Sequence, residues 1–145
     1  MNDTKIGENE YMPTKLSART QFHIMRRLTP IIGDVVKAIQ DSKGGDKDEM
    51  ASKVIGPVAE SLAKLSDADA DYVLFGLLRA IKRKLPNGMG YSPICADGHD
   101  AIMYEDINMQ HMLQLAWVAL RYNMSDFFAA LPSDLKDAAQ KLSAQ

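Results

Sequence analysis

The sequence predicts a mainly α-helical single domain: a bundle of four larger helices, a short C-terminal helix, and a small β-hairpin before the long fourth helix. Three observations predict this fold class. Apolar residues recur at helical spacing over four stretches of the chain. Serine, aspartate or asparagine stands before several of them, where it can cap a helix. A length of 145 residues suits one domain, which buries about two-thirds of the surface that its unfolded chain exposes.

The chain is expected to have three parts. Residues 1–12 are polar and have no hydrophobic period, which is typical of a flexible N-terminal arm. Residues 13–131 hold the helical domain. Pro132 and Ser133 separate residues 132–145 from it, and these form a short helix over 134–142 or a loosely docked tail.

Two helices with a proline kink are expected first. Ser17 can cap the first, whose apolar residues continue to Ile39; Pro30 removes a backbone donor there, so we expect one kinked unit. The run 41–49 has paired glycines and no apolar residue, which is typical of an exposed loop. The second helix runs from Met50 to about Leu65 and kinks at Pro57.

The third helix is predicted to be the most buried. Ser66 and Asp67 begin it, and residues 73–81 are apolar around more than half of its circumference. The helix continues through residues 82–84, where basic side chains gather at its C-terminal end. After a turn at residues 86–90, the segments 91–94 and 101–104 flank an Asp97-Gly98 pair, which favours a short hairpin.

The fourth helix, from Asp106 to Leu131, carries two apolar faces. One broad face includes the single tryptophan, Trp117, and suits the core. The second face has the alternating four- and three-residue steps of an a/d seam and consists of His111, Leu115, Val118 and Tyr122. In a small helical domain such a seam is either sandwiched in the core or used for interaction. Met109 and Met112 at its start suit a groove that accepts more than one helix.

The composition limits where the protein is expected to reside and which kinds of functional site it can contain. The single Cys95 cannot form an internal disulfide, and no apolar run approaches the roughly 20 residues that span a bilayer, so we expect a cytoplasmic protein without membrane contact. Cys95 and His99, with Asp97 and Asp100, could supply two strong metal ligands, but a structural zinc site needs about four. Phosphate-binding and nucleophile-elbow motifs are absent. We therefore expect no metal, no cofactor and no enzymatic activity.

Nucleic-acid binding is the alternative function. Basic residues occur in the first helix and at the end of the third, and they could form one patch if these helices lie side by side. The net charge of −2 creates no general attraction for a polyanion, and no aromatic residues interleave the basic clusters. The pattern therefore favours a solvated face or an acidic protein partner, and a small DNA-binding regulator stays the second hypothesis.

Three blocks of the sequence resemble a known family, the tail assembly chaperones of bacteriophages and prophages. The blocks are YMPTKLSARTQFHIMRRLTPII, PVAESLAKLSDADADYVL and YEDINMQHMLQLAWVALRYNMSDFF, at residues 11–32, 57–74 and 104–128. They are packing patterns without a reactive constellation. The resemblance implies a non-catalytic helper, encoded near the tape measure protein, that acts in the cytoplasm of the bacterial host and is not part of the mature virion.

The resemblance also implies its partners. Such a helper binds the helix-rich tape measure protein and is displaced when tail tube subunits polymerise around it. The partner contacts that we expect come from the first and the fourth helix: Phe22, Arg26, Arg27, Met109, Met112, Leu115, Val118 and Tyr122. The same seam could instead join two copies of the chain, so a homo-oligomer stays open.

Overall fold

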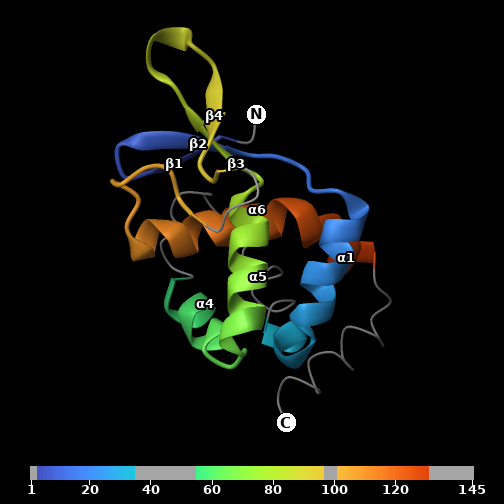
Figure 1. The fold of residues 1–145 in the computed structure, drawn as a ribbon. Coiled ribbons are helices and arrows are strands. Elements are labelled where there is room, and N and C mark those ends of the chain that lie inside the picture. The colour runs from blue at the N-terminus through green and yellow to red at the C-terminus, as the bar shows by residue number, and fades with distance from the viewer. Residues whose placement is uncertain (1–2, 35–54, 97–100, 131–145) are drawn as a thin grey trace.

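The computed structural model describes residues 3–34, 55–96 and 101–130, and its architecture combines an antiparallel sheet with helices (Figure 1). The four-stranded sheet has the order β1 (Thr4–Ile6), β2 (Asn9–Pro13), β3 (Ile81–Lys84) and β4 (Tyr91–Pro93). The described helices are α1 (Ala18–Arg27), α4 (Ile55–Leu62), α5 (Asp67–Leu78) and α6 (Met109–Ala130). Short 3-10 turns are η1 (Thr29–Ile31) and η2 (Pro86–Gly88). The prediction of a mainly α-helical bundle is therefore wrong.

The N-terminal segment, which we expected to be a flexible arm, supplies half of this sheet. β1 and β2 pair antiparallel with Ile6 opposite Asn9, so a two-residue turn joins them. Gly7 opens the turn with a φ of 64°, a conformation that hairpin turns of this length demand and that glycine adopts without strain. Thr4, Ile6 and Tyr11 are buried because alternate residues of a strand face the same side. Their burial on one face explains why so polar a segment is held in place.

β3 corrects a second expectation, because α5 ends at Leu78 and does not continue to Lys84. β3 pairs with β2 on one side, where Tyr11 lies opposite Arg83, and with β4 on the other, where Lys82 lies opposite Pro93. Ile81 is completely buried. A strand between two neighbours forms backbone hydrogen bonds along both edges, and this tertiary pairing overrides the local helical period.

The hairpin that we predicted over residues 91–104 is only partly present. β4 pairs with β3 across the turn that contains η2, rather than with residues 101–104. The expected pairing survives as an isolated bridge between Cys95 and Ile102, where the Met103 amide also donates to the carbonyl oxygen of Ile94 at 2.7 Å. Residues 97–100, with the Asp97-Gly98 pair, lie outside the described residues.

The helix starts follow their predicted caps. The side chains of Ser17 and Ser66 accept hydrogen bonds from the third residues of α1 and α5. α1 ends at Arg27, and Pro30 lies in η1, so the first helix is interrupted rather than continuous through a kink. The predicted loop at 41–49, the start of the second helix and the helix over 134–142 fall outside the described residues.

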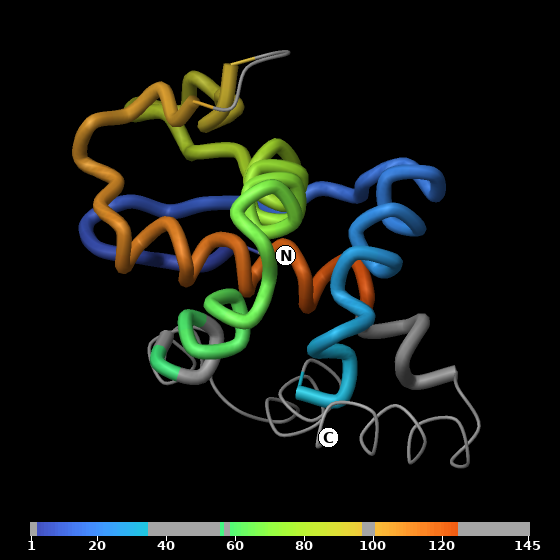
Figure 2. Tube along the Cα trace, turned by 60° about the horizontal axis from the view of Figure 1, so that its bottom comes forward, coloured from blue at the N-terminus to red at the C-terminus, as the bar shows by residue number. Residues whose placement is uncertain are grey.

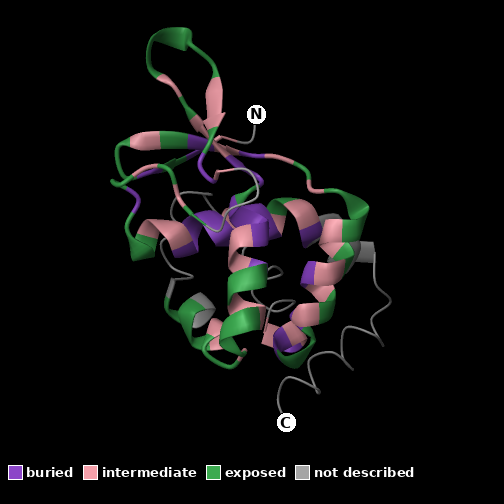
Figure 3. Ribbon diagram, in the orientation of Figure 1, coloured by how far each residue is buried: buried purple, intermediate pink, exposed green. Residues whose placement is uncertain are grey.

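The core lies where α5, α1 and the sheet meet α6. Figure 1 and Figure 2 show α6 running across the molecule with α5 and α1 crossing it, and the buried segments in Figure 3 gather at these crossings. α4 packs against α6 as well. The largest completely enclosed aliphatic side chains come from five different elements or their edges: Ile24, Leu78, Ile81, Ile94 and Leu115.

Candidate partner-binding surface

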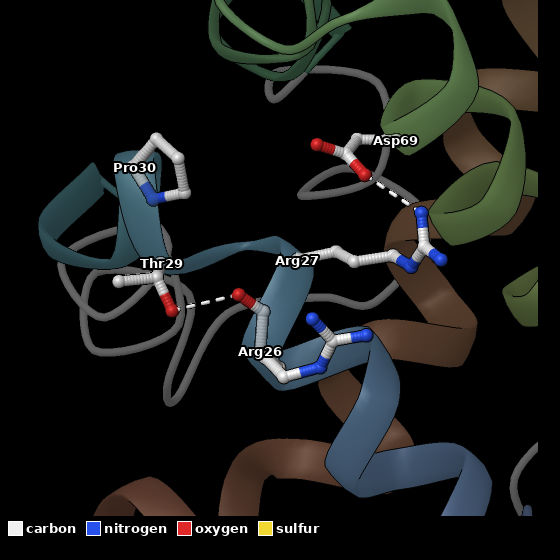
Figure 4. Close-up of a pocket in the computed structure, with 5 residues that line it drawn as sticks. All are labelled: Arg26, Arg27, Thr29, Pro30 and Asp69. Carbon is white, nitrogen blue, oxygen red and sulfur yellow. Dashed lines mark hydrogen bonds and ion pairs between the residues drawn. The ribbon is translucent and has the colours of Figure 1, made fainter.

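A shallow hollow of about 420 Å³ opens on the surface between the end of α1 and the start of α5 (Figure 4). Its lining consists of Arg26, Arg27, Thr29, Pro30 and Asp69. The local sequence forms this wall because α1 stops before the proline turn. Thr29 then donates its hydroxyl to the carbonyl oxygen of Arg26 at 2.8 Å, which satisfies an acceptor that the helix end leaves open. The hollow thus includes two residues that the sequence predicted as partner contacts, Arg26 and Arg27.

Arg27 holds the two sides of the hollow together. Its Nη1 donates to Asp69 Oδ1 at 2.7 Å, and its Cζ lies 4.1 Å from the centroid of the Tyr72 ring. Asp69 is fixed in the first turn of α5, where its amide donates to the Ser66 hydroxyl. The Nε of Arg27 is buried and has no hydrogen-bond partner in the described part of the chain. Arg27 is therefore mainly a link between α1 and α5 that keeps one donor unused.

Phe22 lies one helical turn before Arg26 on α1. Its side chain is 61% exposed, and its ring meets that of His23 edge to face at a centroid distance of 5.3 Å. Residues four apart on a helix share one face, so Phe22 and Arg26 form a continuous strip of aromatic and cationic surface. Because a large aromatic ring in water loses the stabilisation that burial provides, this strip is a candidate contact for another protein.

The other five predicted contacts, on α6, are divided between core and surface. Leu115 is completely buried, and Met112 and Val118 are half-buried and pack against the core cluster. Met109 is 72% exposed and Tyr122 is 41% exposed. The seam is therefore not a continuous exposed strip, because Leu115 in its middle is enclosed while Tyr122 at its end is exposed.

His111, the first residue of that seam, lies against the β1–β2 turn. A methyl group built on Gly7 would lie 3.3 Å from His111 Cε1, so the glycine lets the turn approach α6 closely. Sequence reasoning could not have found this contact, because Gly7 and His111 lie far apart in the sequence.

The basic residues near Lys84 are arranged differently from the predicted helix end. Arg83 Nη1 lies 2.8 Å from Asp106 Oδ1, and Lys84 Nζ lies 3.2 Å from Glu10 Oε2. The hydrogen bond from Arg83 lowers the pKa of Asp106. Arg83 and Lys84 lie on a strand and have acidic partners, so these two residues do not extend a cationic helix end as we expected.

Asn123 is a structural residue that sequence reasoning missed. Its Oδ1 accepts from the Leu16 amide at 2.7 Å and from Gln21 Nε2 at 3.1 Å. Its Nδ2 donates to the carbonyl oxygens of Thr14 at 3.1 Å and Ala119 at 2.9 Å. An asparagine within a long helix was the available signal, because its side chain competes with the helix for backbone groups unless it has other partners. Asn123 positions the start of α1, and hence the candidate surface, on α6.

Of the four residues considered for metal binding, the structure describes only Cys95. Cys95 is buried in the core, while Asp97, His99 and Asp100 lie outside the described residues. Within residues 3–34, 55–96 and 101–130, no group of three or more His, Cys, Asp and Glu could hold a metal ion. None of the helices described has the length and hydropathy that a membrane crossing requires.

Comparison with known proteins identifies the family. The family model for phage tail assembly chaperone protein, TAC, matches residues 7–136, which include every described helix and most of the sheet. No curated protein and no solved structure gives a significant match. Because the match extends over nearly the whole chain, this protein belongs to the phage tail assembly chaperone family.

Proposed function

We propose that this tail assembly chaperone binds the tape measure protein, keeps it from aggregating, and leaves it when tail tube subunits polymerise around it. Its role is non-catalytic and belongs to the host cytoplasm, before the mature virion forms. Family membership supports a partner from the phage tail. A long helical protein exposes apolar stripes until its surroundings cover them, and such stripes aggregate when left in water.

The exposed ring of Phe22 is the observation that carries this proposal. The aromatic and cationic strip of Phe22 and Arg26 borders the hollow, so an amphipathic helix laid along α1 would bury the ring and bring its polar edge to the arginine. Met109 and Tyr122 are exposed apolar contacts on α6 that could add to it. Scattered contacts of this kind give the modest affinity that displacement by tube subunits requires.

Replacing Phe22 with serine tests the proposal. The tape measure protein is co-expressed with the tagged chaperone, and the co-purified amount and the dissociation constant are measured. Losing one ring that is buried on binding costs about 1.5–3 kcal/mol, so we expect roughly tenfold or greater weakening for Phe22→Ser. Met89→Ser is the matched control, because Met89 is 72% exposed on the β3–β4 turn and away from α1. It should bind like the wild type.

Two outcomes would overturn the proposal. If the wild-type chaperone neither retains the tape measure protein nor raises its soluble amount, the assigned partner is wrong. If Phe22→Ser and Met89→Ser bind equally well, the contact surface is wrong. Thermal unfolding of each variant separates lost binding from lost folding, since neither side chain is buried. Purified tail tube subunits, added to the complex, should release the chaperone.

A further inference from the structure

We propose that the hollow between α1 and α5 receives a carboxylate side chain of the partner. The partner segment is an amphipathic helix that carries Asp or Glu about one turn away from an apolar residue, which covers Phe22. This inference deepens the proposed function and rests on it for the identity of the partner. It specifies which residue types a segment of the partner must carry to be bound.

The charge of the lining favours an acid. Two arginines and a single carboxylate line the hollow, so one positive charge is in excess. Asp69 and the Tyr72 ring already engage Arg27, whereas Arg26 is exposed and its guanidinium has no ion-pair partner in the described ranges. In Figure 4 both guanidinium groups point away from Pro30, and only that of Arg27 reaches Asp69.

The hydrogen-bonding capacity of the hollow is also incomplete. Arg27 Nε is buried without an acceptor among the described residues, and a buried donor without a partner destabilises the surface that contains it. The planar arginine side chain presents several donors in a fixed fork that matches a carboxylate. A carboxylate entering the hollow would therefore meet the exposed guanidinium of Arg26 beside that of Arg27.

The spacing on α1 sets the spacing on the partner. Phe22 and Arg26 are four residues apart, which is about 6 Å along the helix axis. A helix lying along α1 presents residues three or four apart at the same distance, so its apolar residue and its acid are separated by one turn. Asp67 and Asp71 are exposed on α5 outside the lining and would favour a basic segment instead, so the test has to separate the two charges.

The experiment uses the full-length chaperone and tiled peptides of about 25 residues from the tape measure protein. Each peptide has one twin with Asp and Glu replaced by Asn and Gln, and another with Lys and Arg replaced by Gln. We expect the acid-neutralised twin of a bound peptide to bind about fivefold more weakly at low salt, and the difference to shrink at high salt. Arg26→Gln should abolish this difference. Arg79→Gln should preserve it, because Arg79 caps the C-terminal end of α5, about 15 Å from Asp69.

The outcomes separate this inference from the proposed function. Equal binding by the acid-neutralised twins, or identical behaviour of Arg26→Gln and Arg79→Gln, overturns the carboxylate site while Phe22-dependent binding stands. Weaker binding by the base-neutralised twins alone would assign the contact to Asp67 and Asp71 and also overturn it. If no peptide and no intact tape measure protein binds, the proposed function itself fails. Unchanged thermal unfolding of Arg26→Gln establishes that the fold is intact.

Discussion

Asn123 is the residue on which the position of α1 depends. Its amide group forms four hydrogen bonds, two as acceptor and two as donor, and these join α6 to the connection between β2 and α1. The amide serves both roles at this place, whereas a carboxylate accepts but cannot donate. The contribution of Asn123 to stability should therefore depend on its donor nitrogen as well as on the shape of its side chain.

Replacing Asn123 with aspartate tests that dependence with an almost isosteric side chain. The substitution removes the side-chain donor to the carbonyl oxygens of Thr14 and Ala119 and places a negative charge beside them, so we expect a loss of about 2–3 kcal/mol. The midpoint of thermal unfolding should fall by roughly 5–10 °C.

Asn108→Asp is the matched control for the same chemical change. The Asn108 side chain only accepts, from the His111 amide at the start of α6, and aspartate does so equally well and suits the helix dipole. Its stability should stay within about 0.5 kcal/mol of the wild type. Equal unfolding midpoints for both variants would refute the donor role of Asn123.

Some individual residues of the candidate surface could be predicted from the sequence. The helical period of the first helix is local, so it correctly places Arg26 on the exposed side. The same period groups Phe22 with the apolar residues of this helix, whereas its side chain is 61% exposed. The same reasoning cannot decide which of two apolar faces on α6 is covered, since that depends on where α5 and the sheet pack. Leu115 is consequently enclosed, while Tyr122 reaches the surface. Asp69 lines the hollow because it contacts Arg27, which lies 42 residues away in the sequence, and local sequence patterns do not reveal such a contact.

Among the elements, α1 and α5 approach one another closely at a glycine. Gly76 is buried in α5, and a methyl group built there would lie 3.2 Å from Ile24 Cδ1 and 3.6 Å from its Cγ1. Ile24 is itself completely buried, so it has little room to move away. The glycine costs helix propensity but lets the two helices that form the hollow pack directly against each other.

A double-mutant cycle measures this packing. Gly76→Ala should destabilise the wild type, because the tight contact outweighs a helix-propensity gain of about 0.8–1 kcal/mol. Ile24→Val removes the Cδ1 atom at a cost of about 0.5–1.5 kcal/mol. In the Ile24→Val background Gly76→Ala should then stabilise the protein, with a coupling on the order of 1 kcal/mol in chemical denaturation. If the effects of the two substitutions are simply additive, the contact between Gly76 and Ile24 does not determine how closely α1 and α5 pack.

Element boundaries were predictable where local chemistry sets them. Ser17 and Ser66 cap helices as expected, because a cap depends on its immediate neighbours. β3 was missed because the sequence Ile81–Lys84 continues the period of α5, while its strand conformation depends on β2 and β4. A Gly-Glu pair between Ile6 and Asn9 was the one available signal for the first hairpin.

At the scale of the whole molecule, Arg83 links the sheet to the segment that precedes α6. It pairs with Asp106 at 2.8 Å and lies 4.3 Å over the Tyr104 ring, while Asn9 Nδ2 donates to the other carboxylate oxygen of Asp106 at 3.2 Å. The hydrogen bond from Arg83 depresses the pKa of Asp106 below its ordinary value of 3.8. The folded state therefore favours the ionised form of this carboxyl group.

The pH dependence of unfolding should show this link. A carboxyl group with a depressed folded pKa stabilises the protein above its unfolded pKa, and this stabilisation is lost as the pH falls through the folded value. We expect Asp106→Asn to be less stable than the wild type at pH 7 and the difference to shrink below about pH 4. Urea unfolding at several pH values measures it.

Replacing Arg83, the partner of Asp106, supplies the control. In an Arg83→Met background the pKa of Asp106 should return towards its ordinary range, because its main cause is gone. Asp106→Asn should then alter the pH profile little. A stability difference between the wild type and Asp106→Asn that stays constant from pH 7 to pH 3 would contradict the assignment.

The pairing of Tyr11 with Arg83 has a consequence for how the protein is made. On a translating ribosome, β2 emerges long before the strand that completes it, and at about 5–20 residues per second the wait is roughly 4–15 s. During that interval the nascent hairpin exposes an open strand edge, which is a template for pairing with other chains. The chaperone must therefore pass through an aggregation-prone stage of its own before it can protect another protein.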